Sequence, residues 1–133
     1  MIGALKKLFG TKYDRDVKNY LPIVEEINQH YKSFASLSND ELRNKTLEFR
    51  KMISDHLSEI DAEISELKGN ISSEEDILTK EKFYLAIDEL VKERDEQLEV
   101  ILKELLPAAF AVVKETSRRF SENETLIVTA SDH

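Results

Sequence analysis

The sequence predicts an all-α protein built around a long antiparallel helical hairpin of coiled-coil character, with shorter helices before and after it. The composition is the first indication: 35% of the residues are charged and 41% are apolar, with only three glycines and two prolines, which is typical of helix-rich proteins. The second indication is the spacing of the apolar residues, which recur at three, four and seven positions. A chain of 133 residues is expected to form one domain, so residues 1–133 are treated as a single helical region.

The first expected element is a basic amphipathic helix over residues 1–12. This stretch carries Lys6, Lys7 and Lys12 and no acidic residue. Its apolar residues are expected to share one side of the helix: Ile2, Leu5, Leu8 and Phe9. Such a helix either lies in a membrane interface, drawn there by anionic lipid, or docks its apolar face on the rest of the protein. The residues alone leave both options open.

A second helix is predicted over residues 14–36, with Asp14 as its cap. Its apolar residues follow one another at three and four positions, which predicts one amphipathic face: Val17, Tyr20, Leu21, Val24, Ile27 and Tyr31. Pro22 lies inside this pattern, so we expect the helix to kink or to restart there.

The hairpin is predicted over residues 38–106 and begins with a capping box at Ser38 and Glu41, a serine followed three residues later by a glutamate. Its first helix is expected to run to about Lys68 and to end at Gly69-Asn70. The register slips near Phe49. The seam of this helix is predicted from six residues: Thr46, Ile53, Leu57, Ile60, Ile64 and Leu67.

The second helix of the hairpin is expected to open with caps at Ser72 and Ser73. Five apolar residues spaced by seven predict its seam, with Tyr84 as a core aromatic: Ile77, Tyr84, Val91, Leu98 and Leu105. Ile87 and Ile101 fill alternate positions that Lys80 and Arg94 interrupt, and the two basic side chains are expected to lay their stems over the seam. Helices of roughly 44 and 50 Å joined by a short loop favour an antiparallel hairpin. The alternative is a seam that pairs with a second copy, giving a homodimer.

A short helix over residues 107–120 is predicted to start at Pro107, which the first turn of a helix tolerates. Phe110 and Val113 recur near helical spacing in it. The tail, residues 121–133, contains the β-branched run Thr125–Thr129. That run predicts either an edge strand or a disordered segment.

Composition and motifs exclude several classes of function. The chain has no cysteine, so disulfides and thiolate chemistry are excluded. Residues 55–105 carry 16 acids and 6 bases, which argues against nucleic acid as a partner. No apolar run approaches a membrane span or a secretory signal core, so the chain is expected to stay inside the cell. No G-x-x-x-x-G-K-[ST] loop exists among the three glycines, and the three histidines have no convergent ligand partners. We therefore predict no catalytic, cofactor-binding or metal-binding residue.

Three stretches carry a resemblance to a known family. Residues 105–120, LLPAAFAVVKETSRRF, resemble "IPEAFAVVREASKR", and residues 37–50, LSNDELRNKTLEFR, resemble "LSDEELKGKTAEFR". Residues 1–15 are more distantly similar to "KVFGSRNDR". The three quoted family segments are those of SecA, the ATP-driven motor of bacterial preprotein export. They occur in the family's order, while residues from about 52 to 104 resemble an insertion.

The resemblance implies the N-terminal part of such a motor. It implies ATP and Mg in the intact parent, whose phosphate loop would follow residue 133, so we expect a fragment that is inactive alone. It also implies a cytoplasmic protein peripherally associated with the inner membrane, with the translocation channel, acidic phospholipid and preproteins as partners. The expected membrane- and channel-contact residues are Ile2, Leu5, Lys6, Lys7, Leu8 and Phe9. The motif residues Leu42, Phe49, Phe110 and Val113 are expected to be structural. The alternative is a stand-alone helical interaction or dimerisation module.

Overall fold

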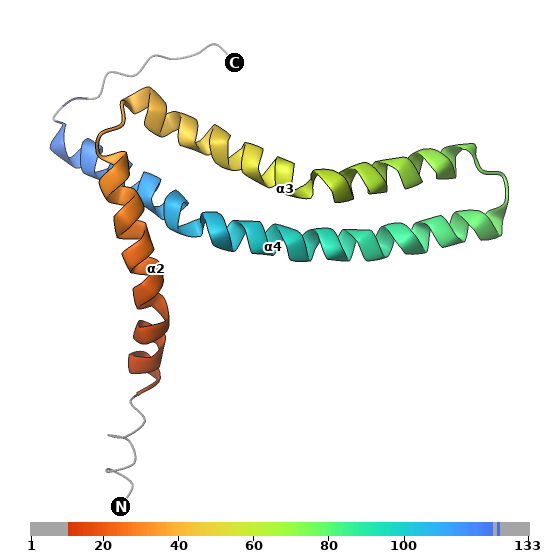
Figure 1. Cartoon of the computed structure of the whole chain (residues 1–133), viewed down its shortest axis with the longest axis horizontal. Helices are drawn as coiled ribbons and strands as arrows, with labels where there is room; N and C mark the ends of the chain where they lie inside the picture. Colours follow the sequence, from red (N-terminus) through yellow and green to blue (C-terminus); the bar gives the residue numbers. More distant parts are fainter. Residues whose placement is uncertain (1–10, 124, 126–133) are drawn as a thin grey trace, which may run out of the picture. The chain divides into compact units, whose positions relative to one another are not determined.

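The fold consists of three α-helices in the part of the chain that the computed structural model describes, residues 11–123 and 125. They are α2 (Lys12–Phe34), α3 (Asn39–Ser73) and α4 (Ile77–Glu122) (Figure 1). No strand occurs among these residues, so the all-α prediction is confirmed. The predicted helix over residues 1–12 and nearly all of the predicted strand at residues 125–129 lie outside the described residues.

The helices contribute to two compact units. Among the described residues, unit 1 comprises residues 11–42, 107–123 and 125, and unit 2 comprises residues 43–106. Unit 1 therefore holds α2, the first turn of α3 and the C-terminal third of α4. Unit 2 holds the rest of α3 and α4, which lie side by side in it (Figure 1).

The start of α2 differs from the prediction by a few residues. Thr11 is the N-cap, and its hydroxyl accepts a hydrogen bond from the Asp14 amide at 3.2 Å. Asp14 occupies the third helical position, where its carboxylate accepts the Thr11 amide at 2.7 Å. This bond, together with a bond from the Thr11 hydroxyl to the same carboxylate oxygen at 2.9 Å, lowers the pKa of Asp14. The helix continues through Pro22 to Phe34, so the predicted restart is wrong.

The boundary between α3 and α4 also moved. α3 runs through Gly69 to Ser73. The Ser72 and Ser73 hydroxyls donate to the carbonyl oxygens of Lys68 and Asn70 in their own helix and do not cap the next one. Asp76 caps α4: its carboxylate accepts the amide of Thr79 at 2.8 Å. An acceptor at this position satisfies amides that the first turn leaves unpaired.

The helix predicted to start at Pro107 is instead the end of α4, which continues without a break from Ile77 to Glu122. A proline inside a helix loses one hydrogen bond and crowds the preceding turn, at a cost of about 3 kcal/mol. Pro107 is buried, as are its neighbours Leu105, Ala108 and Ala111. Burial of this stretch offsets the cost, so packing decides the conformation here.

The seam predicted for α3 matches the burial pattern in unit 2, except at Thr46, which is exposed. Leu57 and Ile64 are buried, with exposed fractions of 2% and 7%. The half-buried or buried positions between Lys45 and Leu57 follow one another at four residues, which agrees with the register slip near Phe49.

The seam predicted for α4 is wrong over its first half. Tyr84 is 57% exposed and Ile77 is 79% exposed, whereas Phe83 and Leu90 are half-buried and Ile87 is buried. The buried face therefore contains the positions of Lys80 and Arg94, both half-buried. Two sets of positions on adjacent flanks of this helix have seven-residue spacing: Ile77, Tyr84 and Val91, and Lys80, Ile87 and Arg94. The spacing alone does not show which of the two sets is buried.

Candidate functional site

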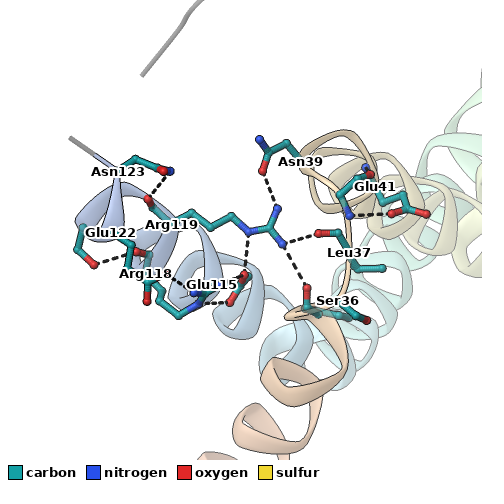
Figure 2. Close-up of polar contacts among 12 residues, drawn as sticks. Ser36, Leu37, Asn39, Glu41, Glu115, Arg118, Arg119, Glu122 and Asn123 are labelled. Carbon is teal, nitrogen blue, oxygen red and sulfur yellow. Dashed lines mark hydrogen bonds and ion pairs between the residues drawn. The ribbon is translucent and has the colours of Figure 1, made fainter. Parts of the chain in front are cut away.

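The most extensive group of polar contacts lies in unit 1, where α4 meets the α2–α3 connection. Glu115, Arg118 and Arg119 share one face of α4 because residues three and four apart are neighbours on a helix. Figure 2 shows this face beside the connecting residues, with the Arg119 side chain reaching from α4 to them. We call Glu115, Arg118 and Arg119 the clamp.

Glu115 is the centre of the clamp, and its residue surface is 0% exposed. Its two carboxylate oxygens accept from Arg118 Nε at 2.9 Å and Nη2 at 2.7 Å, and from Arg119 Nε at 2.7 Å. Arg118 also pairs with Glu122. The hydrogen bonds from Arg118 and then Arg119 outweigh burial and lower the pKa of Glu115 from 4.5 to about 2. The same pairing raises the pKa of Arg118. Glu115 is thus held as a fully paired carboxylate.

Arg119 connects this carboxylate to the end of α2 and the start of α3. Its guanidinium donates to the Leu37 carbonyl oxygen at 2.6 Å, to Asn39 Oδ1 at 2.7 Å and, more weakly, to the Phe34 carbonyl oxygen at 3.4 Å. The last carbonyls of a helix have no partner within the helix, and a planar fork of five N–H donors suits several acceptors at once. Arg119 therefore links α4 to both ends of the connection.

Two local features hold the backbone that carries the acceptors of Arg119. The capping box is confirmed: the Ser38 amide donates to Glu41 Oε2 at 2.7 Å, and the Glu41 amide donates to Ser38 Oγ at 3.3 Å. Phe34 and Leu42, on either side of the connection, are 8% and 5% exposed. Capping and burial together fix the backbone between α2 and α3.

Lys114 makes a further link between α4 and α2 in unit 1. Its Nζ donates to Asn28 Oδ1 at 2.6 Å and lies 4.4 Å from the centre of the Tyr31 ring. An ammonium at that distance from an aromatic face is attracted by the ring quadrupole. Lys114 thus links α4 to α2, and the clamp links α4 to the α2–α3 connection.

The chemistry open to the clamp is binding and positioning. A saturated carboxylate with a lowered pKa cannot take up a proton near neutral pH, and both arginines already use their forks. Among residues 11–123 and 125, no group of three or more potential ligands could hold a metal ion. The clamp is therefore a structural device that fixes the connection.

The structure distributes the predicted functional residues unevenly. Ile2, Leu5, Lys6, Lys7, Leu8 and Phe9 lie outside the described residues, so their role stays a prediction. Of the four motif residues, Leu42 is buried and Phe49 is half-buried, but Phe110 and Val113 are 56% and 62% exposed. The buried positions of that stretch are instead Leu105, Pro107, Ala108, Ala111 and Glu115.

The clamp itself was missed by the sequence reasoning. The available signal was Glu115 three and four residues before two arginines. That spacing is also common on exposed helix surfaces, so it could not by itself predict a buried carboxylate. Within the described part of the chain, no helix is apolar over a length sufficient to cross a bilayer.

The comparisons with known proteins agree on one family. The family described as the SecA DEAD-like domain matches residues 5–128. "Protein translocase subunit SecA" of Phocaeicola vulgatus is 50% identical over 126 residues, covering 95% of this chain and 11% of that protein. The proteins of the same name from Cytophaga hutchinsonii and Flavobacterium psychrophilum are 44% and 43% identical and cover 98% and 97% of this chain.

The chain spans only about one eighth of the length of these relatives, 11–12% of each. No solved structure matches it. The family match covers more than half of the chain and includes the clamp and all of α2, α3 and α4. The chain therefore belongs to the SecA family, in the region of its DEAD-like domain.

Proposed function

We propose that this chain is the N-terminal helical part of a SecA-like ATP-driven motor that moves preproteins across the bacterial inner membrane. The observation that carries the proposal is the match to translocase subunits along 95–98% of the chain and 11–12% of their length. The chain contains no phosphate loop, so ATP and Mg would bind in the rest of such a motor. Its own contribution would be structural and interfacial.

In this proposal, unit 1 provides the helical lead-in to the nucleotide-binding domain. The Arg119 contacts to Leu37 and Asn39 support this role, because they fix the α2–α3 connection against α4. A fixed connection would give the motor a rigid base in this region. Phe110 and Val113, which are exposed on the same part of α4, would then be available to further residues of the motor.

For unit 2 we propose an antiparallel, coiled-coil-like hairpin. Its support is the order of two cross-helix contacts: Arg94 Nε donates to Asp61 Oδ1 at 2.5 Å, and His56 lies 3.2 Å from Gln97 Oε1. The earlier residue of α3, His56, thus contacts the later residue of α4, Gln97, which is the order expected for antiparallel helices. The same register pairs buried or half-buried positions at every layer: Phe49 with Leu105, Ile53 with Ile101, Leu57 with Gln97, Ile60 with Arg94, Ile64 with Leu90, Leu67 with Ile87, and Ile71 with Phe83.

We further propose that the basic N-terminal segment contacts the membrane and the translocation channel. Lys6 and Lys7 would meet anionic headgroups, each basic residue near an anionic surface contributing about 1 kcal/mol. Ile2, Leu5, Leu8 and Phe9 would bury apolar area in the interface. The chain would then act in the cytoplasm, peripherally bound to the inner membrane.

The motor role is tested by a chimera. The equivalent segment of the Phocaeicola vulgatus subunit is replaced by this chain, and ATP-dependent preprotein uptake into inverted membrane vesicles is measured. We expect uptake at the level of the parent subunit, because the segments are 50% identical over 126 residues. A chimera that folds and hydrolyses ATP but imports nothing would contradict the proposed role.

The membrane contact is tested by vesicle sedimentation of the full chain. Lys6→Glu/Lys7→Glu should reduce binding to acidic vesicles. The two substitutions lower the charge of the segment by four units, so attraction to the anionic surface becomes repulsion. The matched control is Lys51→Glu/Lys92→Glu, which makes the same change at two exposed positions of unit 2. Equal binding by wild type and Lys6→Glu/Lys7→Glu would refute the electrostatic part of the proposal.

A further inference from the structure

The exposed flank of α4 in unit 2 carries a regular pattern that the packing of this unit does not use. Ile77, Tyr84 and Val91 are spaced by seven residues and are 79%, 57% and 41% exposed. Glu81, Asp88 and Asp95 alternate with them at the same spacing and are also exposed. At 100° per residue, these six positions fall on one side of the helix. We call them the outer stripe.

The outer stripe is separate from the face that packs on α3. The inner face of α4 contains Phe83, Ile87 and Leu90, which are buried or half-buried. Two further large apolar residues, Leu78 and Leu85, are 67% and 61% exposed in the same turns of α4 as the outer stripe. Single exposed apolar residues are ordinary, but several aligned along four turns mark an interaction surface.

The acids of the outer stripe are available to a partner. In the part of the chain that the structure describes, Glu81, Asp88 and Asp95 form none of the salt bridges. Neighbouring acids off the stripe are paired instead, such as Glu89 with Lys92 and Glu99 with Lys103. The stripe thus combines unpaired negative charge with apolar side chains at coiled-coil spacing.

Charge selects the kind of partner. Residues 55–105 carry 16 acids and 6 bases, so a second copy of the stripe would oppose acid to acid, and like-charge contacts across an interface are unfavourable. Anionic lipid and nucleic acid are repelled for the same reason. A helix with apolar residues at seven-residue spacing and lysine or arginine between them complements both the apolar residues and the acidic residues of the outer stripe.

We propose that the outer stripe is a docking surface for a basic amphipathic α-helix of another protein. The helix lies along α4 with its apolar residues against Ile77, Tyr84 and Val91, and its basic residues meet Glu81, Asp88 and Asp95. This is recognition of a helix by an apolar strip, with flanking charges that choose the partner. The inference rests on unit 2 alone and is independent of the proposed motor role.

The test is binding of a designed probe to the full chain. The probe is a 21-residue helical peptide with leucine at seven-residue spacing and lysine at the intervening stripe positions, followed by fluorescence anisotropy. A second peptide carries glutamate in place of lysine. We expect the lysine peptide to bind and the glutamate peptide to bind at least tenfold more weakly, because close charge pairs control partner choice.

Two triple variants locate the site. Glu81→Lys/Asp88→Lys/Asp95→Lys should weaken binding of the lysine peptide by about tenfold or more. The matched control Glu89→Lys/Glu93→Lys/Glu96→Lys makes the same charge change on the opposite flank of α4, and should weaken it by less than about threefold. Circular dichroism checks that both variants keep the helical content of the wild type.

Three results would overturn the proposal. The first is no binding of the lysine peptide by the wild-type chain. The second is an equal loss of affinity in both triple variants, which would indicate attraction to net charge alone. The third is self-association of the chain through the stripe, seen as a dimer mass in sedimentation equilibrium that Tyr84→Lys/Val91→Lys returns to monomer.

Discussion

Replacing Glu115 by glutamine tests whether the clamp stabilises unit 1. The change keeps the size of the side chain but removes its charge. It also places an amide NH2 where the carboxylate accepted bonds from Arg118 and Arg119. Because Glu115 is 0% exposed, water cannot replace those bonds without opening the packing around α4.

The expected loss is about 2 kcal/mol. A pKa lowered from 4.5 to about 2 corresponds to roughly 3 kcal/mol at 1.36 kcal/mol per pKa unit. Removing one partner of a buried ion pair costs about 3–5 kcal/mol. The Arg118 side chain is 35% exposed and retains Glu122, so solvent screens part of the interaction and lowers both figures.

The assay is urea unfolding of the full chain at pH 7, followed by circular dichroism. With a urea dependence of about 1.5 kcal/mol per molar, a loss of about 2 kcal/mol moves the midpoint of unit 1 by about 1.3 M. The control is Glu104→Gln, the same substitution at an exposed position of the same helix. Its midpoint should match that of the wild type.

The same variant predicts a pH dependence. The pKa of Glu115 is lower in the folded chain, so its stabilisation is present above pH 4.5 and is lost as the pH falls through about 2. The difference between wild type and Glu115→Gln should therefore be constant near neutral pH and should shrink between pH 4.5 and about 2. A difference under 0.5 kcal/mol at pH 7, or one that grows on acidification, would refute the reasoning.

Four other substitutions test the remaining features. Arg119→Lys keeps the charge but loses the fork, so amide exchange in residues 34–39 should accelerate about tenfold or more. Leu57→Ala, at a site 2% exposed, should lower the free energy of unfolding by about 3 kcal/mol, while Tyr84→Ala should cost under about 0.5 kcal/mol. A larger loss of unfolding free energy for Tyr84→Ala would indicate that Tyr84 packs in the seam. Pro107→Ala should raise stability by about 1 kcal/mol in the urea assay, because alanine supplies an amide for the Lys103 carbonyl.

Local features were predictable because neighbours in sequence create them. The capping box at Ser38 needs only a serine, a glutamate and the turn between them, and both of its hydrogen bonds are present. Most inward positions of α3 were also predictable, since most of its apolar residues, including Leu57 and Ile64, occupy one stripe, whereas Leu47 and Met52 lie off it and are exposed. The family resemblance rested on the same kind of local motif and agrees with the match over residues 5–128.

The clamp was not predictable in the same way. Glu115, Arg118 and Arg119 have the spacing of an ordinary surface pair, and burial depends on what packs against that face. The distant acceptors for Arg119 are the carbonyl oxygens of Phe34 and Leu37 and the side chain of Asn39, 80 to 85 residues earlier in the chain. No sequence pattern records that these oxygens lie within reach of an arginine so far along the chain.

By itself, the sequence determined that this chain is helical, where α3 begins, which stripe of α3 is buried and which family the chain resembles. Only tertiary structure decided which flank of α4 packs on α3, that α4 continues through Pro107, and that Glu115 is buried among arginines. The physical reason is the range of the interactions. Periodicity and capping act within a few residues, whereas α4 offers two apolar flanks and one costly proline, and packing against distant residues selects among these alternatives.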